Sequence, residues 1–177
     1  MRKTPSKKEL LLNEAIALAA EVHKHQIRQE PDGRPYICHI LDVVNSIPKF
    51  RRTTRIIAAL HDTLEDSSED QRAKLRKIIK ERFGNKVLLG VEAISHFKKE
   101  GLTQEQEIAD YLNYITNQVS KDRRATLVKL ADNYVNMKDR IHLFMAGDEE
   151  QKEKARQKVN LYAQSIAKLT EKPKSPK

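Results

Sequence analysis

The stretch that decides the fold reads Ile56-Ile57-Ala58-Ala59-Leu60-His61-Asp62-Thr63-Leu64-Glu65-Asp66. It contains no Gly or Pro and is rich in Ala, Leu and Ile, which predicts a helix. At about 100° per residue, its ionisable side chains fall within one arc of roughly 140°, and these are His61, Asp62, Glu65 and Asp66. The apolar side chains Ile57, Leu60 and Leu64 lie on the other side.

A helix that turns acid and imidazole groups to one side needs a partner for that charge, because buried carboxylates without a partner are strongly penalised. A divalent cation is the simplest such partner. The alternative is an exposed helix end with an acidic tail. That alternative fits Ser67-Ser68-Glu69-Asp70 well and His61-Asp62 poorly, and this stretch alone leaves both interpretations open.

Composition favours one soluble, all-α domain spanning residues 1–177. A chain of 177 residues is long enough for a real core. It is 38% hydrophobic and 33% charged, so a highly charged surface covers a modest interior. Only five Gly and six Pro are present, which favours long uninterrupted helices, and strand-like alternation is hard to find.

The formal net charge of +9 suits either nucleic acid or a phosphorylated small molecule. Basic residues are spread along the chain and few aromatics accompany them, so no stacking platform for nucleic acid is visible. We therefore expect no nucleic-acid partner. Both termini are rich in Lys, and residues 1–6 and 170–177 are predicted to be disordered tails.

Cysteine and hydropathy patterns bear on the compartment. The single Cys38 excludes an internal disulfide and favours a reducing, cytoplasmic location. The longest apolar runs are far shorter than the ~20 residues of a membrane span, and no signal peptide is recognisable. We expect no membrane partner. The sequence does not give the oligomeric state, and a homodimer is one of the states considered.

Helical spacing of apolar residues predicts about eight helices. Their expected ranges are 7–25, 40–47, 53–66, 68–83, 86–97, 103–119, 123–139 and 148–169. Thr53, Thr103 and Asp122 are the expected N-caps. Gly84 is the expected C-cap of the fourth helix, and Pro48 follows the end of the second.

A second charged cluster lies in the helix expected over 123–139. Asp132 and Asn136 are four residues apart and share a face, and Lys129 lies one turn earlier on it. An Asp beside apolar residues in mid-helix is unfavourable unless it is paired or bound to something. The alternative is a surface pair between Asp132 and Lys129, which would contribute little. His39, taken alone, is more often a hydrogen-bonded core residue than a ligand.

Together these motifs resemble a known family. The chain is similar to HD-domain phosphohydrolases, specifically the stand-alone (p)ppGpp hydrolases related to the hydrolase half of RelA/SpoT proteins. The resemblance covers about residues 15–140 and is carried, in the family's order, by His25-Gln26-Ile27-Arg28, Pro35-Tyr36-Ile37-Cys38-His39, Ala58–Asp66, Phe83-Gly84, Val128-Lys129-Leu130-Ala131-Asp132 and Asn136.

The resemblance implies an all-α HD-domain bundle with its site between the helices that bear His39, His61 and Asp132. The residues that match the family's metal ligands are His39, His61, Asp62 and Asp132. The pair that orients and activates the attacking water matches Glu65 and Asp66. Arg28 matches an Arg near the guanine base, and Lys129 and Asn136 match positions beside the nucleotide. Two imidazoles and two carboxylates suit Mn²⁺, with Zn²⁺ or Fe²⁺ as alternatives.

The activity implied is that of a metal-dependent 3′-pyrophosphohydrolase, which converts the alarmone (p)ppGpp to GDP or GTP and pyrophosphate. The chain length predicts that no synthetase domain is included. The sequence departs from the family where Gln29 replaces a Lys and Ile40 replaces a Pro, whereas the insertion Glu30-Pro31-Asp32 matches the longer loop of some stand-alone members. The Lys missing at Gln29 keeps other substrates open. One alternative is a phosphohydrolase for ppApp or NADPH.

The other alternative is a non-catalytic HD module that senses nucleotides. The intact Glu65 and Asp66 argue against it. Arg156 and Tyr162, in the last expected helix, are further candidates for substrate contact.

Overall fold

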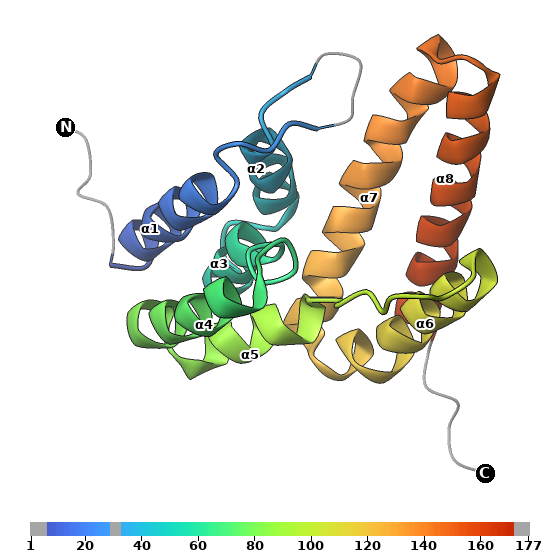
Figure 1. The fold of residues 1–177 in the computed structure, drawn as a ribbon. Helices are drawn as coiled ribbons and strands as arrows, with labels where there is room; N and C mark the ends of the chain where they lie inside the picture. The colour runs from blue at the N-terminus through green and yellow to red at the C-terminus, as the bar shows by residue number, and fades with distance from the viewer. Residues whose placement is uncertain (1–6, 29–32, 172–177) are drawn as a thin grey trace.

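The computed structural model describes residues 7–28 and 33–171, and within these ranges the chain is all-α, as predicted. The described residues form eight α-helices and one short 3-10 helix, and among them there is no strand beyond an isolated bridge between Ile27 and Pro35. The elements are α1 (Lys7–Val22), α2 (Ile37–Ser46), α3 (Arg52–Leu60), α4 (Glu69–Phe83), α5 (Asn85–Ile94), α6 (Gln104–Asn117), η1 (Val119–Lys121), α7 (Arg123–Ala146) and α8 (Glu149–Thr170) (Figure 1).

Helix α3 is the centre of the core. All five residues from Ile56 to Leu60 are buried, and the helix contacts α1, α2, α5 and α7. Helix α5 approaches it closely at Gly90, where an added Cβ would lie 2.4 Å from Cδ1 of Ile57. Only glycine leaves room for that approach, so this position sets the spacing between α3 and α5.

Helices α7 and α8 form a long pair that runs side by side, with α6 against α8 (Figure 1). Helix α7 also contacts α2, α3 and α5 and contributes Ala125, Val128 and Val135 to the core. It therefore joins the α1–α5 part of the fold to the α6–α8 part. None of the helices in the described ranges has the length and apolar content needed to cross a membrane.

The central stretch differs from its prediction. Helix α3 ends at Leu60, and residues 61–66 form consecutive turns instead of a continued helix. Side-chain donors occupy the carbonyls at this point: the Thr63 hydroxyl donates to Leu60 O at 2.7 Å, and the Ser67 hydroxyl donates to Thr63 O at 2.8 Å. Such local bonds compete with the helical ladder. Ile57, Leu60 and Leu64, the apolar side of the stretch, are all buried.

Other helix boundaries differ from the predicted ones by several residues. Helix α2 begins at Ile37, so His39 lies inside the helix and not before it. Helix α7 continues to Ala146. The predicted N-cap Thr53 is wrong, because α3 begins at Arg52. The caps at Thr103, Asp122 and Gly84 are confirmed, Gly84 with a φ of 88°.

The expected tails are only partly within the described ranges. Thr170, predicted to begin the C-terminal tail, is the last residue of α8. Residues 1–6 and 172–177, and likewise Gln29 and the insertion at 30–32, lie outside the described residues.

Candidate functional site

Three predicted metal ligands come together from three elements. His39 lies on α2, His61 follows the end of α3, and Asp132 lies on α7. All three are buried, and each offers one ligand atom within 4.8 Å of the others. We call these residues the three-ligand group.

The orientation of His61 is fixed by the backbone. Its Nδ1 lies 2.8 Å from the carbonyl oxygen of Ala58, which can only accept, so Nδ1 carries a proton. Its Nε2 lies 2.9 Å from Oδ2 of Asp62 and 3.7 Å from Oδ1 of Asp132. Among the described residues, Nε2 has no hydrogen-bond partner of good geometry.

These surroundings favour a positive charge at Nε2. Burial alone lowers the pKa of His61, but Asp62 and Asp132 outweigh it and raise that pKa well above its usual value. A divalent cation supplies the same charge, and a metal-ligating His commonly donates its other nitrogen to a backbone carbonyl, as His61 does to Ala58. The donor set therefore fits a metal ion.

Asp132 is surrounded by donors. Its Oδ1 lies 3.2 Å from Nε2 of His39 and accepts from the Asn136 amide at 2.6 Å, and its Oδ2 accepts from Nζ of Lys129 at 3.0 Å. Burial alone raises the pKa of Asp132, but Lys129 and the histidines lower it well below its usual value. A buried, ionised carboxylate is thus held at the group's centre.

Asp62 lies at the edge of the three-ligand group. Its Oδ2 is 3.8 Å from Nε2 of His39 and accepts a 2.7 Å hydrogen bond from the Tyr36 hydroxyl. Burial raises its pKa, but His61 outweighs this and holds the pKa well below the usual range. The structure therefore brings Asp62 against both histidines but not within the tight set.

Glu65 and Asp66 face different neighbours. Oε2 of Glu65 accepts from the backbone N–H of His96 at 2.9 Å, and burial raises the pKa of Glu65. Oδ2 of Asp66 lies 3.6 Å from Nδ1 of His23. Burial and the carboxylate of Asp62 raise the pKa of Asp66 to about 7. Both carboxylates line the same cleft, beside the three-ligand group.

This cleft has a volume of about 740 Å³ and runs from Asp62, Glu65, Asp66 and Asp132 to α6 and α8. The predicted substrate residues Arg28, Lys129 and Asn136 line it, as does Tyr162. Its outer end carries a set of cations that we call the basic rim, Lys98, Lys99, Arg140, Lys154 and Lys158. Arg156 does not line the cleft among the described residues; it lies over Phe144 and pairs with Glu153.

Arg28 is held against α7. Its Nη2 donates to Oδ1 of Asn136 at 3.1 Å and to Oδ2 of Asp139, and its guanidinium lies 5.8 Å from the ring centre of Tyr36. Asp139 is buried and was not among the sequence candidates. Its spacing offered a signal, because Asp132, Asn136 and Asp139 follow one another at four and three residues along one helix face.

Three further residues that contact the site gave weaker signals in the sequence. The Tyr36 hydroxyl lay inside a quoted motif, but its bond to Asp62 depends on tertiary structure. His23 and His96 carry no motif, and they meet Asp66 and Glu65 only because α1 and α5 pack around α3. No local spacing could have found them.

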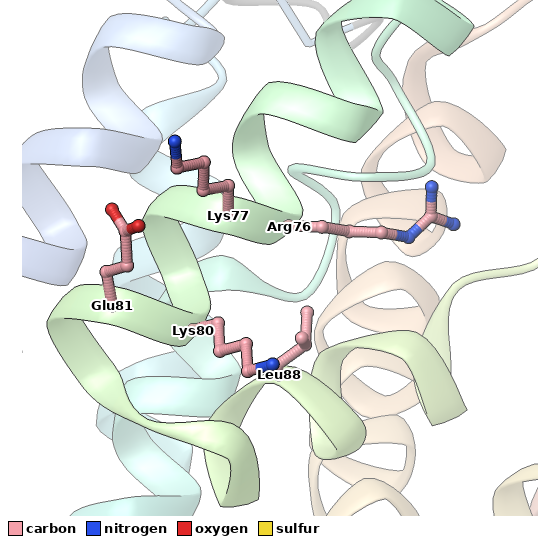
Figure 2. Close-up of a pocket in the computed structure, with 5 residues that line it drawn as sticks. All are labelled: Arg76, Lys77, Lys80, Glu81 and Leu88. Carbon is pink, nitrogen blue, oxygen red and sulfur yellow. The ribbon is translucent and has the colours of Figure 1, made fainter.

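A second hollow of about 550 Å³ lies between α4 and α5 and contains none of the predicted site residues. Figure 2 shows its lining side chains, with Arg76 extending away from Lys77 and Glu81. Nε of Arg76 is already paired with Glu92 at 3.0 Å. The larger cleft is therefore the candidate site.

A family model described as "HD domain" matches residues 15–168. The chain belongs to the HD-domain family. This confirms the family predicted from the sequence motifs, and the matched range includes the three-ligand group, Glu65 and Asp66.

Curated relatives of this HD domain are long proteins. A "GTP pyrophosphokinase rsh" of Brucella melitensis is 34% identical over 140 residues, 77% of this chain and 18% of its own length. A "guanosine-3′,5′-bis(diphosphate) 3′-pyrophosphohydrolase" of Aquifex aeolicus is 32% identical over 154 residues, 86% of this chain and 20% of its own. The chain thus spans about a fifth of the length of these relatives.

The HD domain also resembles a solved structure, described as a metazoan orthologue of SpoT that hydrolyzes ppGpp and plays a role in starvation responses. The TM-score is 0.64 at 22% identity, over 95% of this chain and 94% of that one. At this identity the likeness shows a shared fold, and it confirms the predicted helical HD architecture.

Proposed function

We propose that this HD domain is a metal-dependent hydrolase that removes the 3′-pyrophosphate of (p)ppGpp, giving GDP or GTP and pyrophosphate. The observation that carries the proposal is Nε2 of His61, aimed at two carboxylates on the floor of a cleft that also holds Glu65 and Asp66. The name of the Aquifex relative, a guanosine-3′,5′-bis(diphosphate) 3′-pyrophosphohydrolase, supports this substrate.

The proposed metal ligands are His39, His61, Asp62 and Asp132. Imidazole and carboxylate together suit Mn²⁺, with Zn²⁺ or Fe²⁺ as alternatives. When bound, such an ion would lower the pKa of a water molecule and polarise a phosphoryl oxygen. Lys129 neutralises part of the carboxylate charge of Asp132, which keeps the buried group from carrying an excess of negative charge.

The chain's own carboxylates handle the proton. Glu65, whose pKa is raised by burial, is the proposed acceptor of a proton from the attacking water. Asp66, whose Oδ2 lies 3.6 Å from Nδ1 of His23, is the proposed residue that orients that water. A base with a raised pKa operates closer to neutral pH than an ordinary carboxylate, which suits the proton transfer proposed here.

Substrate binding is proposed for Arg28, Lys129 and Asn136. Because Asn136 and Asp139 hold the Arg28 guanidinium, its flat face has a fixed orientation on which a base can stack. The basic rim suits a ligand with several phosphate groups. The sequence-based expectations of a cytoplasmic location and no nucleic-acid partner remain part of this proposal, and a homodimer remains open.

The test is hydrolysis by the purified protein with Mn²⁺, using ppGpp, pppGpp, ppApp and NADPH with products resolved. We expect release of pyrophosphate from ppGpp and pppGpp, and no release by Asp132→Ala. Faster turnover of ppApp or NADPH would replace the guanosine substrate with that nucleotide. Tight binding of ppGpp without any turnover would favour the nucleotide-sensing alternative.

A further inference from the structure

His96 follows the end of α5, at the boundary between the two parts of the fold. Its backbone N–H is the donor that holds Oε2 of Glu65 at 2.9 Å. This bond links residues separated by 31 positions, so it depends on where α5 and the following segment lie relative to the turns at 61–66. One oxygen of Glu65 is thereby fixed, and the other is left to accept a proton.

The side chain of His96 is anchored independently of that bond. Its Nε2 lies 2.9 Å from Oδ2 of Asp110 on α6. Asp110 also pairs with Lys99, which helps to hold its pKa below the usual value, so the carboxylate is an acceptor. Nε2 of His96 is therefore the donor. Both side chains are only about one-seventh exposed, at 14% and 16%.

Aromatic packing holds the imidazole from a second direction. The ring centre of His96 lies 4.7 Å from that of Tyr114 and 5.6 Å from that of Tyr111. Tyr114 also donates its hydroxyl to the carbonyl of Ile94, and Gln118 donates to carbonyls at the same helix end. Helix α6 therefore determines the backbone position of residue 96 through several contacts.

We propose that His96 is a positioning residue for Glu65. The imidazole, fixed by Asp110 and Tyr114, holds the backbone N–H of residue 96 against the Glu65 carboxylate and so sets the direction in which Glu65 accepts its proton. This proposal rests on the proposed function, in which Glu65 acts as the base. It assigns to α6 a part in catalysis even though α6 contributes none of the predicted metal ligands.

The kinetic test compares His96→Ala, Asp110→Ala and the conservative His96→Gln, whose amide can still donate to Asp110. We expect the two alanine variants to lose about tenfold in kcat, part of the 10²–10⁴ that a positioned base provides. KM should change less than about twofold, because no substrate contact is removed. His96→Gln should recover most of the loss. Glu92→Gln, which weakens an ion pair on α5 outside the cleft, is the matched control.

A double variant separates positioning from general destabilisation. If His96 acts through Glu65, adding His96→Ala to Glu65→Gln should cost nothing further in kcat. An undiminished tenfold loss in that background would overturn the proposal. So would a raised KM with unchanged kcat in the single variants, since that result would place the imidazole on the substrate.

Hydrogen exchange tests the bond without relying on turnover. In the Mn²⁺-loaded protein, the residue 96 amide should be protected, and Glu65→Ala or Asp110→Ala should each lower that protection at least about tenfold. Glu65→Ala removes the acceptor, and Asp110→Ala frees the imidazole and so displaces the donor N–H. If wild-type protein hydrolyses no nucleotide, the proposed function fails while this measurement still decides the contact. An amide unprotected in wild type, or unaffected by both variants, would overturn the contact itself.

Discussion

The two ends of the cleft differ in burial. We call the end that contains the three-ligand group the floor, and the other end is the basic rim. On the floor, the three-ligand group is buried and held by α2, α3 and α7. On the rim, Lys98, Lys154 and Lys158 are exposed and come from the segment after α5 and from α8. The floor is enclosed by packed helices, whereas these rim side chains extend into solvent.

This difference separates chemistry from recognition. A buried charge that loses its partner is strongly destabilising, so floor substitutions should affect metal, stability and turnover together. Lys154 and Lys158 are exposed, and exposed cations are screened, so substituting them should affect substrate binding alone. The predictions below test that separation.

The largest effect is expected on the floor. Asp132→Ala leaves Lys129 buried without its carboxylate partner. The free energy of unfolding should fall by about 3–5 kcal/mol, and Tm by roughly 10 °C for a chain of this length. His61→Ala should also lose the metal. Metal analysis of wild type should give about one divalent ion per chain, and both variants should fall well below it.

The control for this loss is Asp42→Ala, which removes an exposed carboxylate from the same helix as His39. It should keep both the ion and the Tm. Full metal retention in Asp132→Ala and His61→Ala would contradict the assignment of the floor.

A second, smaller effect should distinguish the loss of the proposed base from the loss of the metal ion. Glu65→Gln combined with Asp66→Asn should keep the ion and lose at least about 100-fold in kcat, the usual scale for general-base catalysis. Glu69→Gln with Asp70→Asn, a neighbouring carboxylate pair at the start of α4, is the matched control. Undiminished turnover in the first pair would mean that these carboxylates do not act on the water.

The basic rim should respond in KM. Lys154→Ala with Lys158→Ala should raise KM about three- to tenfold and leave kcat within about twofold, because uniform binding is lost. The effect should shrink at high salt. Lys168→Ala, also exposed on α8 but outside the cleft, should leave KM unchanged. A large fall in kcat in the rim variant would break the separation of floor from rim.

A separate effect, on the pH dependence of stability, concerns Asp66 in metal-free protein. Its pKa of about 7 lies above the unfolded value near 4. Folding is therefore favoured where Asp66 is protonated, and this contribution is lost as pH rises from about 4 through 7. Asp66→Asn should have a Tm close to wild type at pH 5 and a higher one at pH 8. A Tm difference that does not change with pH would contradict the raised pKa.

The residues of the floor were predicted from the sequence more completely than those of the rim. Ile57, Leu60 and Leu64 are buried as their spacing required, and His39, His61 and Asp132 meet as the motifs implied. The turns at 61–66 were missed because helix propensity takes no account of Thr63 and Ser67 hydroxyls that bond to backbone carbonyls.

Contacts across long stretches of chain were missed for a different reason. Asp139 meets Arg28 across 111 positions, and His96 meets Glu65 across 31. Neither pairing produces a periodic pattern in the sequence, because both depend on which helices pack together in the core. The roles of the individual site residues remain predictions that the variants above can test.

The missing side chain at Gly90 has a consequence beyond packing. Because α5 lies so close to Ile57, the distance between α3 and α5 is determined by the absence of a single carbon atom. The same two helices lead into the turns that carry Glu65 and into the segment that carries His96. Gly90 thus sets the distance between α3 and α5. A methyl group added there would push the two helices apart and so displace Glu65, the proposed proton acceptor, without touching it.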